Sequence, residues 1–393
     1  MEKRSRVEKF LLFYISLDNF ALGLTLSIGM LYFLSRGVSL SWIGYLASIS
    51  ALTILIFEFP TGVVADKFGC GLSVFISNIL LFLSFLIAYF SYGNFMFLIV
   101  SIISAIGMTF STGALSGWFI QKEPSVKKRL ALIYSEINIL SNIFKLVGGI
   151  LGAIIFSFLK PLPFLLSSLL YGFLSISFLF FNRFKLINIS NNSQKNPIRE
   201  LIEHSKESIL FSYREKRILY IFLVTFFFII AATGPFIYWQ PFFKNQFKST
   251  FPVGIVFAVY SLSAILGSSV LRANIPKIKR YGLAFSISIL FGGIMIFLTG
   301  FTKIALLSLI FFSIYHFSLG IGNPIRMKLL NEVIPDEKRA SILSFLSLIE
   351  GGGEGLSGFM WGGLSRAFPL NIIFSLVSIP ILLSFILSLK LKD

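Results

Sequence analysis

The sequence has few of the residues that bind metals or form cross-links. Its 393 residues include one cysteine, Cys70, and two histidines, His204 and His316. A single cysteine excludes an internal disulfide and a cysteine metal cluster, and two isolated histidines form no metal-site pattern. The chain contains no G-x-x-x-x-G-K-[ST] nucleotide loop and no nucleophile with a paired base. We therefore expect no cofactor and no enzyme activity.

Charged residues are also scarce, at 13%, whereas 56% of the residues are hydrophobic and 47 are phenylalanine. A soluble domain carries about twice that charged share. Apolar runs of about 20 residues recur along the chain, and each is long enough to cross a bilayer as a helix. We expect an all-α membrane protein with twelve transmembrane helices in two six-helix halves. The predicted spans are 10–34, 42–64, 72–92, 95–120, 130–157, 163–182, 217–240, 252–274, 282–301, 304–325, 340–366 and 370–389.

The distribution of basic residues predicts the orientation of these helices. The net charge is +17, from 34 basic and 17 acidic residues. With a cytoplasmic N-terminus, 27 basic residues fall on the cytoplasmic side, 6 lie in outer loops, and Lys145 lies inside a span. This is the positive-inside pattern. We expect a multi-pass protein of the cytoplasmic (inner) membrane, with both termini cytoplasmic and no nucleic-acid partner.

A polar stretch divides the chain into three parts. Residues 1–182 form a predicted N-terminal six-helix bundle, 183–216 a cytoplasmic linker, and 217–393 a C-terminal six-helix bundle. Within the linker, "NISNNSQKNP" has a flexible composition. The following "PIRELIEHSKESIL" predicts a basic amphipathic helix on the inner membrane surface. A solvated tether is the alternative interpretation.

The two halves carry an internal repeat. The segment that starts at Arg129 aligns with the one that starts at Arg339, at a constant offset of 210 residues. In this alignment Gly148 meets Gly358 and Gly152 meets Gly362, in spans five and eleven. Parallel repeats with a binding site at their interface are typical of transporters.

A short motif connects the chain to a known family. "EFPTGVVADKFGCGL", residues 58–72, resembles the signature loop of the major facilitator superfamily, and "YWQPFF" (238–243) and "LLNEVIPDEKRASILSFLSL" (329–348) resemble pieces of its bacterial drug and metabolite permeases. The matching positions are Gly62, Ala65, Asp66, Lys67 and Gly69, whereas Cys70 and Gly71 stand where a basic pair is expected.

This resemblance implies a twelve-helix transporter that works by alternating access. It also implies that the segment with Gly62, Asp66, Lys67 and Gly69 is a gating loop, in which Asp66 ties the two halves together in one conformation. The alternative is a tight connection with solvated charges. Glycines at 62 and 69 fit both a turn and a close approach of helices.

Six ionisable residues are the candidates nearest the middle of predicted spans, where a charge costs several kcal/mol and is a functional candidate by default, whereas Glu136 lies nearer the inner surface. Glu350 and Glu354 are four residues apart and share one helical face. Two neighbouring carboxylates in a low dielectric repel each other, so we expect one of them to carry a coupling proton. The alternative is a structural pair that is salt-bridged to Lys145 or to another basic residue. The complete set is Asp18, Glu58, Lys145, His316, Glu350 and Glu354.

Lys145 and His316 each have two interpretations. Lys145 either neutralises Glu350, Glu354 or Asp18 or binds an anionic substrate. His316 either joins a proton relay or is a hydrogen-bonded core residue. One lysine against four acids favours protons or a cationic substrate. Aromatic side chains with buried acids suit flat cations. The predicted cavity aromatics are Trp118, Tyr238, Trp239 and Tyr315.

We therefore predict a proton-coupled secondary transporter that exports a drug-like or natural-product small molecule. The alternative is a proton-coupled importer of a nutrient or metabolite, because "KLVGGILG" in span five lacks the Gly-Pro step of the family's antiporter signature. A non-transporting sensor or scaffold is a remote alternative. For the transporter, the expected partners are the substrate, protons and the lipid bilayer, with sodium as an alternative coupling ion. We expect a monomer.

Overall fold

A computed structural model describes residues 4–123, 130–182, 186, 215–249, 252–335 and 339–391. The chain divides into two units. Unit 1 comprises Met1–Trp42, Ile49–Asn191 and Ser249–Ala258, and unit 2 comprises Ile43–Ser48, Asn192–Lys248 and Val259–Asp393. The predicted amphipathic helix of the linker lies outside the described residues.

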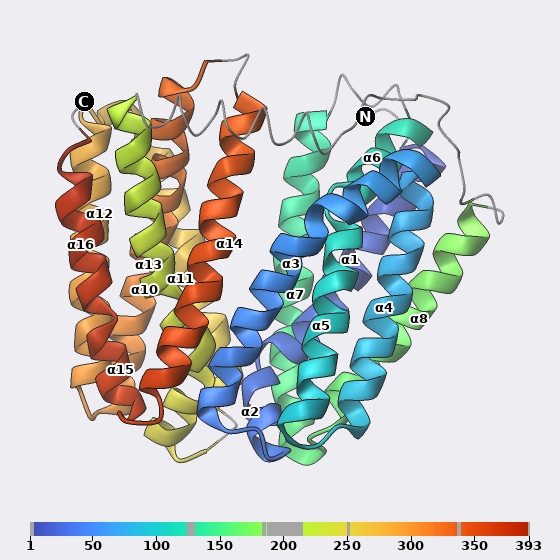
Figure 1. The fold of residues 1–393 in the computed structure, drawn as a ribbon, viewed down its shortest axis with the longest axis horizontal. Helices are drawn as coiled ribbons and strands as arrows, with labels where there is room; N and C mark the ends of the chain where they lie inside the picture. The colour runs from blue at the N-terminus through green and yellow to red at the C-terminus, as the bar shows by residue number, and fades with distance from the viewer. Residues whose placement is uncertain are drawn as a thin grey trace. The chain divides into compact units, whose positions relative to one another are not determined.

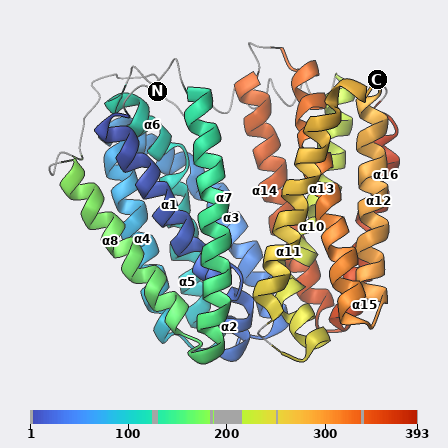
Figure 2. The same ribbon diagram turned by 180° about the vertical axis from the view of Figure 1, so that it is seen from behind.

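Unit 1 consists mainly of helices from the first half of the chain (Figure 1). Its most extensive helix pair is α1 with α7, which lie side by side (Figure 2). Trp118, Phe178 and Tyr171 belong to its hydrophobic core. The helices are α1 (Arg6–Leu26), α2 (Gly29–Ser35), α3 (Leu40–Phe68), α4 (Cys70–Phe90), α5 (Gly93–Ser111), α6 (Ala114–Lys122), α7 (Leu130–Phe158) and α8 (Leu162–Phe181).

Unit 2 contains most of the helices of the second half (Figure 1). α10 packs against α14 and α16, and α12 packs against α13. The helices are α10 (Lys216–Phe247), α11 (Pro252–Asn274), α12 (Tyr281–Phe301), α13 (Ala305–Val333), α14 (Arg339–Leu364), α15 (Leu370–Leu376) and α16 (Ser378–Ser388), and the short 3-10 helix η2 (Ile275–Lys277) follows α11.

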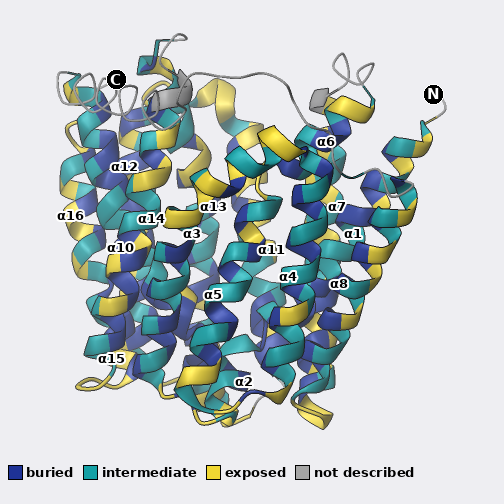
Figure 3. Cartoon of the chain, turned by 45° about the vertical axis from the view of Figure 1, so that its right-hand side comes forward, coloured by how far each residue is buried: buried dark blue, intermediate teal, exposed yellow. Residues whose placement is uncertain are grey.

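The structure confirms the predicted all-α membrane fold. Within the described residues, eleven helical segments are long and apolar enough to cross a membrane. α14 corresponds to the remaining predicted span and has 26 residues, or about 39 Å at helical rise. Its glycines and two glutamates lower the apolar content of its central turns. Exposed positions recur along the helices in Figure 3 rather than only at their ends, as expected for helices that contact lipid.

Candidate functional site

A charged cluster joins three helices of unit 2. The Nη1 atom of Arg326 on α13 donates to Oε1 of Glu350 on α14 at 2.7 Å and to Oγ1 of Thr225 on α10 at 3.1 Å. The Arg326 side chain is 13% exposed and that of Glu350 is 30% exposed. A charge-assisted hydrogen bond of this length is among the stronger protein interactions. Arg326 therefore neutralises Glu350 and links α13 to α10 and α14.

Arg326 was not predicted from the sequence. Span ten was expected to end at residue 325, with Arg326 in a cytoplasmic loop, but α13 continues to Val333. Ile325, Leu329 and Leu330 are buried, and their 3.6-residue period carries the helix through Pro324. That apolar period was the signal in the sequence that the helix continues past Pro324.

Glu354 lies one helical turn beyond Glu350 on α14, as their spacing predicts. It is exposed, and no salt bridge to it occurs among the described residues of unit 2. Glu350 is near enough to repel it electrostatically. The structure therefore brings the two glutamates together as predicted and gives them different surroundings, because one carboxylate is paired with a cation and the other is not.

A second polar group lies inside unit 1. The Asp18 carboxylate on α1 lies near the Tyr171 hydroxyl on α8, and Lys145 on α7 is close enough to attract its charge. One turn from Asp18, the Tyr14 hydroxyl donates to Oδ1 of Asn78 at 2.7 Å. Lys145 and Asp18, both in unit 1, therefore lie close enough to interact, and the role of Lys145 stays a prediction.

An aromatic cluster surrounds His316 in unit 2. Its imidazole stacks on the Tyr260 ring with centroids 4.3 Å apart and an interplanar angle of 27°. Phe312 contacts the imidazole edge-on at 4.7 Å, and Trp239 contacts Tyr260 at 5.2 Å. Tyr315 is 5.3 Å from His316, and its buried hydroxyl has no hydrogen-bond partner among the described residues. Tyr260 was not predicted, because its place beside His316 depends on how α11 meets α13.

A groove of about 560 Å³ lies next to this cluster, between α11 and α13. The two helices approach closely, since a Cβ on Gly320 would clash with the carbonyl oxygen of Ala264. Pro324 has no N–H to donate to the carbonyl of Gly320, and the Ser268 hydroxyl donates to that oxygen at 2.9 Å instead. Side chains from both helices line the groove, among them Ser268, His316, Asn323 and Pro324.

The other predicted cavity aromatics are buried. Trp118 lies in the core of unit 1, where its indole N–H donates to Oδ1 of Asn182 at 2.9 Å. This is a core position rather than a cavity wall. Tyr238 is fully buried in unit 2 and hydrogen-bonds to Ser365.

The segment that resembles the signature loop is helical almost throughout. α3 continues to Phe68 and α4 begins at Cys70, so Gly69 alone connects them. Its φ of +104° is a conformation that residues with side chains rarely adopt, which explains the glycine. The predicted extent of the loop is therefore wrong, because the motif occupies the last turns of a helix and one linking residue.

The other motif residues lie on these last turns of α3. Asp66 and Lys67 are exposed, and among the described residues of unit 1 Asp66 makes no ion pair. A Cβ on Gly62 would meet nothing within 4 Å, so a close helix approach does not explain this glycine. Glu58 is exposed one turn earlier. The gating role of this segment and the coupling role of Glu58 stay predictions.

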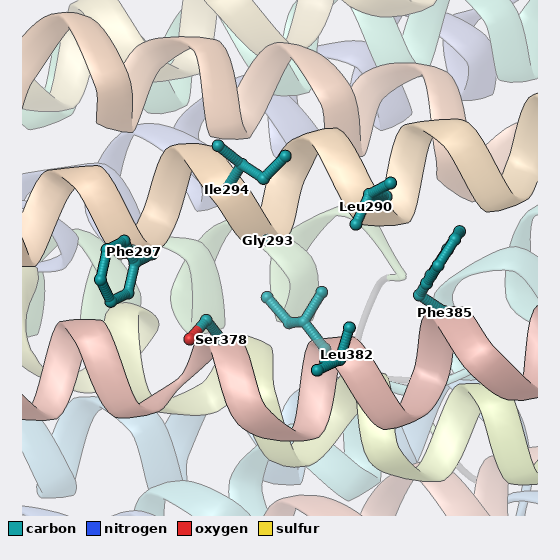
Figure 4. A pocket seen from close by; sticks show the side chains of 8 residues that line it. Leu290, Gly293, Ile294, Phe297, Ser378, Leu382 and Phe385 are labelled. Carbon is teal, nitrogen blue, oxygen red and sulfur yellow. The ribbon is translucent and has the colours of Figure 1, made fainter.

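Another cavity, of about 260 Å³, lies between α12 and α16 (Figure 4). Its lining is apolar except for Ser378, whose hydroxyl already donates to the Ser375 carbonyl at 2.6 Å. The side chains of Ile294 and Leu382 are about half exposed. An apolar cavity on exposed helix faces suits lipid contact and offers no polar group for substrate recognition.

Comparison with known proteins agrees with this architecture. The sequence model of the Major Facilitator Superfamily matches residues 10–358. A Bacillus subtilis (strain 168) protein described as an uncharacterized MFS-type transporter, YxaM, is 27% identical over 386 residues, which cover 97% of this chain and 95% of that protein.

Solved transporter structures share the fold. The nucleoside transporter NupG matches with a TM-score of 0.82 and 14% identity, covering 98% of this chain and 99% of that one. A POT family transporter in complex with 5-aminolevulinic acid matches with a TM-score of 0.74 and 13% identity, covering 98% and 95%. Because the family model spans most of the sequence, and a relative and the fold agree with it, the chain belongs to the Major Facilitator Superfamily of membrane transporters.

Proposed function

We propose that the protein is a proton-coupled secondary transporter of a small organic molecule, in which Glu354 carries the proton. The observation that supports this best is the difference between two neighbouring glutamates: Arg326 neutralises Glu350, whereas Glu354 one turn away has no cationic partner among the described residues of unit 2. The acid that lacks a cation is the one that gains more from binding a proton.

Protonation of Glu354 removes its electrostatic attraction for Arg326 and its repulsion of Glu350. The two carboxylates are one turn apart, about 6 Å at helical rise. At an effective dielectric constant of about 20, unit charges at that distance interact by about 3 kcal/mol, and the exposure of Glu354 reduces this to about 1–2 kcal/mol. An ionised Glu354 competes with Glu350 for Arg326, and a protonated Glu354 does not. This difference shifts the populations of two arrangements of α13 and α14.

Uptake together with protons is the direction that we propose. The preference for a cationic substrate relied on a surplus of acids in the membrane, and Arg326 removes one of them by pairing with Glu350. α7 runs as one helix from Leu130 to Phe158 and contains no proline, so it lacks the antiporter step. Solved relatives of the fold include a nucleoside transporter and POT family transporters, whose names fit this direction.

Export is the second candidate. The resemblance of "EFPTG" to drug permeases and the 16% aromatic content favour it. Proteoliposomes with an internal pH dye separate the two directions without knowledge of the protein's orientation in the vesicle. If external substrate enters together with protons, the lumen acidifies on substrate addition, whereas exchange of substrate for protons makes the lumen alkaline.

The coupling residue is tested by proton flux in the same vesicles. Glu354→Gln keeps the shape and cannot ionise, so we expect it to abolish substrate-driven proton movement while substrate exchange survives. Lys160→Gln, in the connection between α7 and α8 and far from both glutamates in the sequence, is the control for loss of one charge. Wild-type proton stoichiometry in Glu354→Gln would refute the assignment and would leave Asp18 as the next acid to test. The same flux in sodium-free buffer excludes sodium coupling.

A further inference from the structure

The groove between α11 and α13 is a feature that proton coupling does not explain. Its volume of about 560 Å³ falls within the range of small-molecule sites. Neither aspartate, glutamate, lysine nor arginine is among the residues that line it. Its polar groups are the His316 ring, the Asn323 amide and the Ser268 hydroxyl. The groove therefore offers hydrogen bonds without a fixed charge.

The Asn323 amide lines this groove and is exposed, so a polar partner can reach it. Asn323 is exposed although it lies within the helix α13, eighteen residues from its first residue. An amide that faces hydrocarbon without a hydrogen bond costs about 2–7 kcal/mol, and exposed polar residues in membrane helices face water-filled paths. The face of α13 that carries Asn323 is thus one that water or a polar ligand reaches.

The spacing of the polar groups fixes the size of a ligand. His316 and Asn323 are seven residues apart on one face of α13, about 10 Å along the helix axis. Between them lie the apolar side chain of Leu319 and the bare backbone of Gly320. Tyr260 and Phe312 hold the His316 ring in place by stacking and edge contact. A ligand that contacts both residues can therefore be a flat ring system no longer than about 10 Å, with a polar edge at each end.

We propose that this groove binds an uncharged, flat nitrogen heterocycle that carries an amide-like edge, with Asn323 pairing with that edge and His316 contacting the ring. The inference rests on the proposed function, because a transporter requires a substrate site. An asparagine amide presents one donor and one acceptor side by side, which complements a carboxamide or lactam. No charged side chain lines the groove to pair with a charged ligand, so the lining favours an uncharged one.

Three probes of nearly the same shape test the charge preference. Nicotinamide is neutral, nicotinate is an anion, and 1-methylnicotinamide is a cation with the same amide. We expect nicotinamide to raise the melting temperature of the purified protein and the two charged probes to leave it unchanged. Equal or larger shifts with either charged probe would overturn the proposal, and so would the absence of any shift with millimolar nicotinamide.

Variants of one residue assign the contact. Asn323→Leu keeps the volume and loses both hydrogen bonds, so nicotinamide should bind at least about 10-fold more weakly, the equivalent of about 1.4 kcal/mol. Asn323→Asp adds a negative charge and should make 1-methylnicotinamide the better ligand. Ser269→Ala is the matched control, because the Ser269 hydroxyl bonds within its own helix, to Ile265, and does not line the groove. Unchanged probe preference in Asn323→Asp would place the ligand elsewhere.

The binding assay tests the groove and the flux assay tests proton coupling, so either proposal can be refuted without the other. Binding of nicotinamide that Asn323→Leu abolishes supports the groove even if no protons move, in which case the coupling proposal is wrong. If a charged substrate drives proton movement in the wild type and equally in the groove variants, coupling is supported. The proposed substrate class is then refuted. Melting temperatures of the unliganded variants show whether each of them is folded.

Discussion

Removal of either partner of the Arg326–Glu350 pair should destabilise unit 2 by an amount that a double-mutant cycle measures. The two side chains are joined by a 2.7 Å hydrogen bond, which places the charge centres about 4 Å apart. At an effective dielectric constant of about 20, they attract by about 4 kcal/mol. Because the Glu350 side chain is 30% exposed, we expect solvent to halve this, to a coupling energy of about 2 kcal/mol.

The variants are Arg326→Met, Glu350→Gln and the double variant, which replace each charge with a side chain of similar length. The measurement is the free energy of unfolding in mixed detergent micelles as the fraction of SDS rises. Each single variant leaves a partner unpaired, so the double variant should be less destabilised than the sum of the two. A coupling energy below about 0.5 kcal/mol would show that the pair is only a surface contact and would remove Arg326 from the proposed mechanism.

Three further predictions concern glycines and topology. Gly152→Ala should destabilise the protein by at least about 1–3 kcal/mol, because its Cβ would clash with the Leu24 carbonyl oxygen, and a thermal unfolding assay checks this. Gly69→Ala should cost about 1–3 kcal/mol through its positive φ, whereas Gly62→Ala, with open space around it, should cost nothing in the same assay. The topology is tested with single cysteines introduced at position 160 or 194 in a variant that lacks Cys70. In intact cells an impermeant thiol reagent should label the first and not the second, and the reverse result would contradict cytoplasmic termini.

The helices could be predicted from sequence because each follows from a local property. A membrane helix needs only about 20 apolar residues, and the predicted spans match the helices of both units within a few residues at most ends. Errors occurred where a helix extends beyond the apolar run. α3 continues through Lys67 and α13 through Lys328, since backbone hydrogen bonds propagate a helix into water once it has formed.

The site was less predictable because it depends on contacts between helices. The spacing of Glu350 and Glu354 gave their common face, but the cation beside one of them comes from α13, 24 residues earlier in the chain. Asp18 and Tyr171 are 153 positions apart and meet only because α1 and α8 pack together. A single sequence carries no signal for such pairs, whereas the charge of each residue and its depth along a helix can be read directly.

Asn323 links the two parts of the proposed site. It lines the groove with His316, and it also lines a cavity of about 10 Å³ with Arg326. Pro324 follows it directly, at the point where α13 lacks one backbone hydrogen bond and Ser268 replaces it. A helix bends most easily at such a position. On the proposed mechanism, a ligand that pulls on Asn323 would move the segment that carries Arg326, and Arg326 would in turn affect the carboxylates of α14. Coupling between substrate and proton would then need no contact between them, because one bend in α13 would respond to both.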